Sequence, residues 1–326
     1  MGSPLYGALC ESAAQTYERD GAFRALLDAN AGRSRLALRL LGAAHFRALR
    51  GSAPQIAQHF PSTGGDGDAA AAWNAIERDV AANRIAYERL LVRPVQTNEV
   101  ARAMPVLAAM LSVSDQTRMP LRVYEIGSSA GLLLQFDRYR YSGEDWSWGD
   151  PDSLLHLRNT SRGGAPAHLD ARLEVTARRG CDVHPLDVTK ADDAETLLGF
   201  VWADQLERLE RLRSAIAVAR AEPATVDRAD GPEWIRHVAQ PQTGYACVAF
   251  HTVILEHLTP EQRDALQARI GELGARATRS APFAWVRMES VDRYETNVTV
   301  WPGGDESLVA RSDGHAQDIE WGMALE

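Results

Sequence analysis

The residues best able to do chemistry follow a short predicted strand near the middle of the chain. Residues 121–126 are mostly apolar and partly β-branched, as a buried parallel strand requires, and Pro120 marks its start. Glu125 lies near the end of this strand, where open α/β sheets bind their ligands. A turn of small residues and then a helix are predicted to follow, and small residues let a ligand approach the backbone. The turn consists of Gly127, Ser128, Ser129, Ala130 and Gly131.

The spacing of this turn discriminates between classes of ligand. A dinucleotide fingerprint needs G-x-G-x-x-G, and a phosphate-binding loop needs a lysine after its last glycine; the turn has neither. An acidic residue, a glycine, three small residues and a second glycine resemble the first motif of Rossmann-like S-adenosylmethionine-dependent methyltransferases. The resemblance implies that Glu125 faces the cationic amino acid part of the cofactor. A plain turn between a strand and a helix, without a ligand, is the alternative.

Asp182 ends another predicted strand and resembles the second methyltransferase motif. The resemblance implies that Asp182 accepts hydrogen bonds from the cofactor ribose and that Val183 lies along the adenine. A carboxylate suits the first role because it offers two acceptor oxygens and no donor. The alternative is an ordinary strand-end turn, where Asp is common. Asp230, at the end of a predicted strand over 224–230, is implied to touch the adenine amino group, and Phe250 is predicted to line the cofactor cleft.

Methyl transfer to a hydroxyl or ammonium group requires a base to remove a proton. His251 is the best candidate, because it ends the strand predicted over 245–251 and histidine titrates near working pH. A histidine hydrogen-bonded to backbone is the alternative. Glu256 and Glu289 are weaker candidates for the base.

The helix predicted from about Thr97 to Leu111 directly precedes the central strand, and Pro105 is expected to kink it. In methyltransferase folds this helix often lies across the cofactor pocket, although helix capping explains its first polar residues equally well. An aromatic segment from Tyr139 is expected to shape a substrate pocket. The predicted substrate-binding residues are Gln96, Asn98, Glu99, Tyr139, Tyr141 and Glu289.

Composition narrows the function classes further. The chain has 326 residues and a formal net charge of −9, which argues against non-specific binding to nucleic acid or to an anionic membrane. Three cysteines without a C-x-x-C pair indicate neither a zinc site nor a disulfide framework, so a reduced, cytoplasmic setting is expected and no metal. The sequence shows no secretory leader pattern and no apolar run that could cross a bilayer.

The apolar periodicities predict two domains. Residues 1–94 are predicted to form a helical N-terminal cap. His45 and His59 in this cap are expected to be surface or capping residues and not ligands. Residues 95–326 are predicted to form a Rossmann-like methyltransferase-type α/β domain with a mostly parallel sheet and an antiparallel C-terminal strand. A β-hairpin insertion is predicted at about 142–178. The strands of this insertion are expected at 154–158 and 171–177. Further along, one helix is predicted over 192–221, a second begins at Pro260 with Thr259 and Gln262 as a capping box, and the last strands are expected at 297–301 and 317–321.

The chain resembles a bacterial family catalogued only as a domain of unknown function, and the resemblance lies in Val95–Arg102, Glu125–Leu134, Asp137–Tyr141, Arg179–Asp187 and Val201–Arg208. Two positions depart from the family pattern: Leu133 stands where an Asn is usual, and Gly314-His315 reverses a usual His-Gly pair. The resulting hypothesis is an S-adenosylmethionine-dependent methyltransferase acting on a small molecule. A non-catalytic ligand-binding protein on the same fold is the main alternative, and a nicotinamide-dependent oxidoreductase is disfavoured by the glycine spacing.

Overall fold

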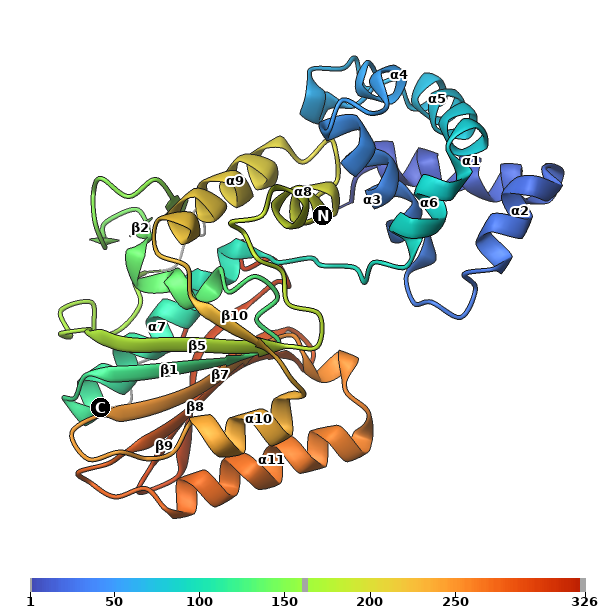
Figure 1. Cartoon of the computed structure of the whole chain (residues 1–326). Helices are drawn as coiled ribbons and strands as arrows, with labels where there is room; N and C mark the ends of the chain where they lie inside the picture. Colours follow the sequence, from blue (N-terminus) through green and yellow to red (C-terminus); the bar gives the residue numbers. More distant parts are fainter. Residues whose placement is uncertain (1, 160–163, 323–326) are drawn as a thin grey trace. The chain divides into compact units, whose positions relative to one another are not determined.

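The computed structural model describes residues 2–159 and 164–322, which form two compact units (Figure 1). The first unit comprises Met1–Asn98 and Asp187–Arg213, and the second comprises Glu99–Leu186 and Ser214–Glu326. Each unit is therefore formed by two separate segments of the chain, and the segments of the two units alternate along the sequence.

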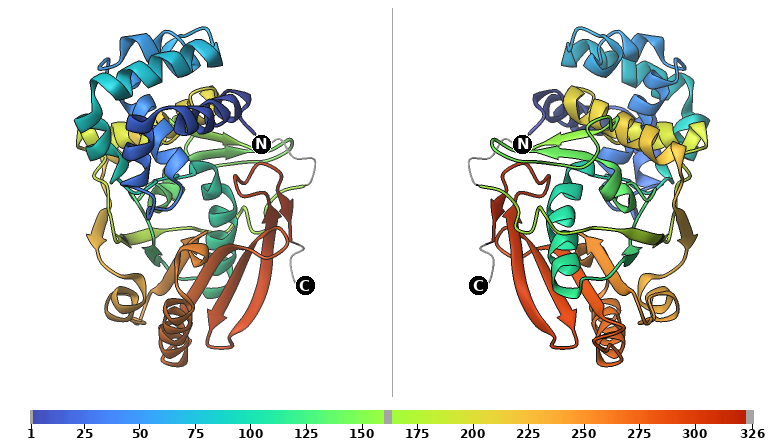
Figure 2. Two further views of the ribbon diagram at one scale, coloured as in Figure 1. Left: turned by 90° about the vertical axis from the view of Figure 1, so that its right-hand side faces the viewer. Right: turned by 90° about the vertical axis from the view of Figure 1, so that its left-hand side faces the viewer.

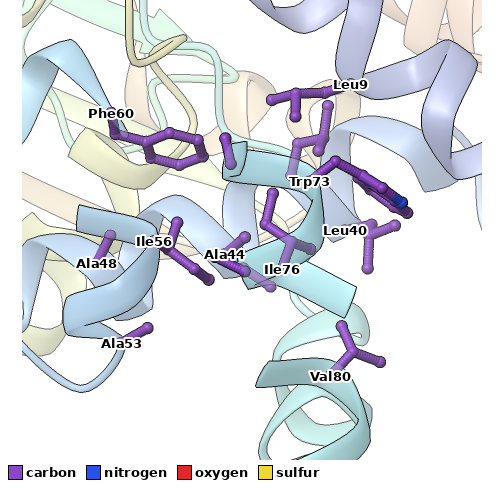
Figure 3. Packing of buried hydrophobic residues seen from close by; sticks show 14 of the residues in the cluster. Leu9, Leu40, Ala44, Ala48, Ala53, Ile56, Phe60, Trp73, Ile76 and Val80 are labelled. Carbon is purple, nitrogen blue, oxygen red and sulfur yellow. The ribbon is translucent and has the colours of Figure 1, made fainter. Parts of the chain in front are cut away.

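The first unit is helical and has its own hydrophobic core. Leu9, Ile56 and Ile76 are fully buried in this core and come from separate helices, and Figure 3 shows them among the buried side chains of the cluster. Each helix alone would expose its apolar face, so their packing supplies the stability. The helical elements are α1 (Pro4–Arg19), α2 (Gly21–Asp28), α3 (Leu36–Leu49), α4 (Pro54–Ala57), the 3-10 turn η1 (Pro61–Thr63), α5 (Ala69–Ala82), α6 (Arg84–Leu91) and α8 (Ala191–Gly199).

The helix predicted over 192–221 is two helices. α8 ends at Gly199, and α9 (Leu206–Ala221) begins after a short connection that contains Trp202. Trp202 stacks on Tyr6 with ring centroids 5.5 Å apart, so a tertiary contact holds the connection outside either helix.

His45 contradicts the expectation of a surface residue, because it is fully buried on α3. Its Nδ1 lies 2.8 Å from the carbonyl oxygen of Val201, and its Nε2 lies 2.7 Å from the Ser62 hydroxyl. Burial lowers the pKa of His45 to about 4. The imidazole is thus a neutral, structural hydrogen-bonding group. His59 pairs with Asp66 at 2.9 Å near the surface, as expected.

The second unit is built on a mixed α/β, mostly parallel sheet of eight strands. Their order is β11-β10-β9-β8-β7-β1-β5-β6. The five strands from β8 to β6 pair in parallel, and the three from β9 to β11 extend the sheet antiparallel. The strands are β1 (Leu121–Ile126), β5 (Val175–Asp182), β6 (Thr225–Arg228), β7 (Ala246–Thr252), β8 (Phe283–Ser290), β9 (Tyr294–Trp301), β10 (Asp305–Ser312) and β11 (Glu320–Trp321).

Helices cover both faces of this sheet (Figures 1 and 2). α7 packs on one face, against β7 to β10, and α10 with α11 packs on the other. Thr259 and Gln262 form the predicted capping box at the start of α11. The helical elements are η2 (Val100–Arg102), α7 (Ala103–Thr117), η3 (Leu133–Arg138), α10 (Gly231–Val238), η4 (Leu255–His257) and α11 (Pro260–Ala275).

Three local predictions are corrected. The helix before β1 starts as η2 at Val100, and Pro105 lies in the first turn of α7, where its missing N–H has no helical partner to lose. The insertion is a three-stranded sheet of β2 (Arg140–Ser142), β3 (Ser147–Trp148) and β4 (His156–Arg158), while residues 175–177 begin β5. At the C-terminus the unpredicted β10 pairs with β9, and β11 covers only Glu320–Trp321 of the predicted strand.

Candidate functional site

The ends of three parallel strands bring the predicted cofactor residues to one edge of the sheet. Glu125 of β1 pairs in register with Gly180 of β5 on one side and with Phe250 of β7 on the other. Asp182 lies at the end of β5, two residues beyond Gly180. The structure therefore places Glu125, Asp182 and Phe250 on adjacent strands at their carboxyl ends, where parallel sheets bind ligands.

Strand alternation also places these three side chains on one face. Ile126, Cys181 and Ala249 belong to the core that packs under α10 and α11. Because successive side chains in a strand point to opposite faces, their neighbours Glu125, Asp182 and Phe250 point to the face covered by α7. The two carboxylates are thus neighbours on the same face of the sheet.

Glu125 is a buried carboxyl group, with only 3% of its surface exposed. Its Oε2 atom is buried and has no hydrogen-bond partner among residues 2–159 and 164–322. Burial raises the pKa of Glu125 well above its usual range, and the negative charge of Asp182 raises it further. A buried polar atom without a partner costs free energy, so this group is a candidate for contact with a ligand.

Asp182 holds the small-residue turn in place. Its Oδ2 accepts a hydrogen bond from the Ser129 N–H at 2.9 Å, and its Oδ1 accepts one from the His184 N–H at 2.8 Å. Ser129 adopts a left-handed backbone conformation with φ of 53°. Each carboxylate oxygen keeps acceptor capacity beyond these single bonds. Asp182 therefore shapes the turn and can still accept a bond from a ligand hydroxyl.

Close backbone packing explains two glycines at the site. Gly127 has φ of 73°, and a Cβ atom there would lie 2.5 Å from Ile254 Cγ2. At Gly180 a Cβ atom would lie 2.3 Å from the Ser128 hydroxyl, which itself donates to the Cys181 carbonyl at 3.2 Å. Only glycine lets the turn lie this close to β5 and to the loop after β7.

Gly180→Ala is expected to destabilise the protein by about 1–3 kcal/mol, because the added methyl group must displace Ser128 from a packed position. Urea unfolding measures the change. Gly271→Ala on α11 is the matched control: its Cβ would meet nothing within 4 Å. That variant is expected to stabilise by about 0.5–1 kcal/mol, since alanine favours a helix. Equal effects at the two positions would contradict the close packing of the turn.

The turn does not lead into the expected α-helix. η3 (Leu133–Arg138) is a 3-10 helix of six residues. The tyrosines that follow it are fully buried; the Tyr139 hydroxyl donates to the Leu132 carbonyl at 2.5 Å, and the Tyr141 hydroxyl donates to the Phe136 carbonyl at 2.6 Å. Both hydroxyls stabilise this short helix, and their predicted contact with substrate stays a prediction.

His251 and Glu289 form a buried pair, with His251 Nδ1 2.7 Å from Glu289 Oε1. Glu289 also accepts hydrogen bonds from the Ile254 and Leu255 N–H groups. The Nε2 of His251 is buried without a partner in the described part of the chain. The His251 ring lies 5.7 Å from that of Trp285, which packs under α10 and α11. The structure thus places this pair at the same sheet edge as Glu125 but on the opposite face.

The remaining predicted cofactor residues follow the ends of β5 and β6, and the predicted substrate-binding residues from Gln96 to Glu99 divide between the two units. Val183 is 57% exposed just beyond β5, and Asp230 precedes α10 and accepts a hydrogen bond from Gln262 at 3.3 Å. Gln96 and Asn98 belong to the first unit, whereas Glu99 belongs to the second and caps η2.

Residues 1–321 match the model of a family described as an uncharacterized protein conserved in bacteria (DUF2332). The chain belongs to this family. The match confirms the resemblance to a bacterial family catalogued only as a domain of unknown function. No curated protein matches the chain.

In this member of DUF2332, the sequence analysis missed one partner at the sheet edge. His315, in the loop after β10, pairs with Glu99 through Nδ1 and Oε2 at 3.0 Å. The reversed Gly314-His315 pair was the available signal. No group of His, Cys, Asp and Glu able to hold a metal ion occurs within residues 2–159 and 164–322. Within the same residues, no helix is long and apolar enough to cross a membrane.

Proposed function

We propose that the second unit binds S-adenosylmethionine and transfers its methyl group to a small molecule. The observation that carries this proposal is the buried Glu125 carboxyl beside Asp182 at adjacent strand ends, with an Oε2 atom that has no hydrogen-bond partner among the described residues. A cationic ligand would supply the donor that Glu125 Oε2 lacks and would offset the cost of ionising the buried group. A pyrophosphate in the same place would offer no donor to Glu125 Oε2 and would be repelled by the Asp182 carboxylate.

The strand order supports the same proposal. In chain order, the five parallel strands β6, β5, β1, β7 and β8 are arranged 3-2-1-4-5, and the order reverses between β1 and β7. Doubly wound sheets bind ligands at this reversal, and Glu125 lies beside it. The cofactor would supply a methyl group on a positively charged sulfur. Glu125 would hold its ammonium group, Asp182 its ribose hydroxyls, and the exposed Val183 would offer an apolar surface to the adenine.

A non-catalytic binding protein remains the second candidate, and one observation favours it. His251, the base predicted from the sequence, lies on the opposite face of the sheet from Glu125. Methyl transfer from labelled cofactor into a metabolite extract separates the two. Incorporation of label indicates an enzyme, whereas tight binding without incorporation across broad extracts indicates a binding protein.

Asp182→Asn is expected to abolish the thermal shift that S-adenosylmethionine produces in the wild-type protein. A ligand at about 100 times its dissociation constant stabilises by about 2.7 kcal/mol, which is readily measured. The Asn side chain keeps one acceptor oxygen for the backbone N–H groups of the turn, but its NH2 group replaces the other acceptor. That NH2 group cannot accept a hydrogen bond from a ribose hydroxyl. The exposed Asp152→Asn is the control and should keep the full shift. A full shift with Asp182→Asn would reject the ribose assignment, and a shift with NAD alone would reject the cofactor.

A further inference from the structure

Glu99 and His315 form a carboxylate–imidazole pair that the cofactor site does not use. Glu99 is 3% exposed; its Oε1 accepts a hydrogen bond from the Ala101 N–H at 3.1 Å, and its Oε2 lies 3.0 Å from His315 Nδ1. A carboxylate only accepts, so the bond assigns the hydrogen of the neutral imidazole to Nδ1. Nε2 then carries the lone pair and can accept a hydrogen bond.

The loop that carries His315 is held from three directions. Arg102 Nε donates to the Gly314 carbonyl at 3.0 Å. Asp313 Oδ1 accepts the N–H groups of His315 and Gln317 at 3.1 and 2.8 Å. Gly314 lies against the Tyr294 ring, where a Cβ atom would come within 2.9 Å. The imidazole is thus positioned before any ligand arrives, as a recognition group should be.

The pair lies at the same edge and on the same face of the sheet as Glu125. β10 runs antiparallel to β9, which runs antiparallel to β8, so β10 ends at the same edge as β1. His315 follows that end, and Glu99 leads through η2 into α7, the helix that covers the Glu125 face.

The sheet between the two groups carries a further unpartnered polar atom. Thr296 of β9 is 1% exposed, and its hydroxyl has no hydrogen-bond partner in residues 2–159 and 164–322. Thr296 pairs in register with Met288 of β8. Met288 alternates with the β8 residues that pack under α10 and α11, so both Met288 and Thr296 point to the α7 face. Three strands separate β1 from β10, a span of about 19 Å at ~4.8 Å per strand.

We propose that Glu99 and His315 form the acceptor end of the methyltransferase site, with His315 Nε2 accepting a hydrogen bond from a hydroxyl or ammonium group of the methyl acceptor. This inference rests on the proposed function. Two carboxylates, Glu99 and Asp313, and one guanidinium, Arg102, contact the loop of His315, so the net negative charge disfavours an anionic acceptor. The substrate class is a neutral or cationic hydroxy or amino compound. The two groups lie at one edge of the sheet, and their separation along that edge is too long for a one- or two-carbon acceptor and suits an extended metabolite.

The test uses the whole chain, methyl-labelled S-adenosylmethionine and a metabolite extract divided by ion exchange into acidic, neutral and basic fractions. Label is expected in the neutral or basic fraction. His315→Leu should lower incorporation at least tenfold, and His315→Gln, whose amide oxygen can accept the same bond, should recover part of it. Both variants should keep the wild-type thermal shift with S-adenosylmethionine, which shows that they fold and bind cofactor.

His237→Leu is the matched control, because His237 pairs with Glu233 at 2.9 Å on the exposed surface of α10. Incorporation by this variant should equal that of the wild type. If His315→Leu also equals the wild type, or if label enters only the acidic fraction, the acceptor assignment is overturned while the cofactor assignment stands. If the wild-type protein shows no thermal shift with S-adenosylmethionine, the proposed function fails and the acceptor assignment fails with it.

Discussion

Glu125→Gln is expected to stabilise the folded protein at pH 8 and at the same time to abolish binding of S-adenosylmethionine. Burial raises the pKa of Glu125 in the folded state, with Asp182 adding to the rise. Above its unfolded pKa, near 4.3, the ionised carboxyl favours the unfolded chain, so its contribution to stability is present at low pH and is lost as pH rises. Gln is isosteric and cannot ionise. Urea unfolding from pH 4 to pH 8 measures the difference.

The stability gain of Glu125→Gln should grow with pH by up to about 1.4 kcal/mol per unit, the limit for one proton, until the folded pKa is reached. The exposed Glu144→Gln is the control and should stay within about 0.5 kcal/mol of the wild type at every pH. In the wild type, ligand binding should release a proton, because the ammonium group favours the ionised carboxyl. Calorimetry in buffers of different ionisation enthalpy detects that proton. A gain independent of pH, or binding without proton release, would contradict the role given to Glu125.

His45 is expected to cause a loss of about 3 kcal/mol in the free energy of unfolding between pH 6.5 and pH 4. Burial lowers its folded pKa to about 4, whereas the unfolded chain titrates near 6.5. Below pH 6.5 the unfolded state takes up a proton that the folded state cannot, so the contribution to stability is full above that pH and falls as pH drops toward 4. Urea unfolding at pH 7, 5.5 and 4 measures this loss.

His45→Gln should remove most of this acid dependence, since Gln can donate to Val201 but does not titrate. The loss in free energy of unfolding that His45→Gln causes, relative to the wild type, is expected to be largest at pH 7 and to shrink by about 3 kcal/mol toward pH 4. His237→Gln, at an exposed position, should leave the acid dependence unchanged. Parallel curves for the wild type and His45→Gln would show that other groups govern acid unfolding.

Local patterns predicted much of the secondary structure. The strand over 121–126 and the capped helix at Pro260 were predicted correctly because apolar periodicity and capping residues act over a few neighbouring positions. The α-helix predicted after Gly131 was wrong. A 3-10 helix forms there, and the Tyr139 and Tyr141 hydroxyls donate to the Leu132 and Phe136 carbonyls, side-chain contacts that apolar periodicity does not reveal. β10 was missed because its polar residues do not alternate regularly with apolar ones.

The sequence alone determined three features: the turn of small residues after β1, the acidic residues at the ends of β1 and β5, and membership of a bacterial family. All three depend on residue type and spacing. Only the tertiary structure decided which groups meet. Strand pairing placed Glu125 beside Asp182 on one face and turned His251 toward the other, because alternate side chains of a strand point to opposite faces. It also joined Glu99 to His315 across 216 positions of the chain, a distance over which no local pattern carries information.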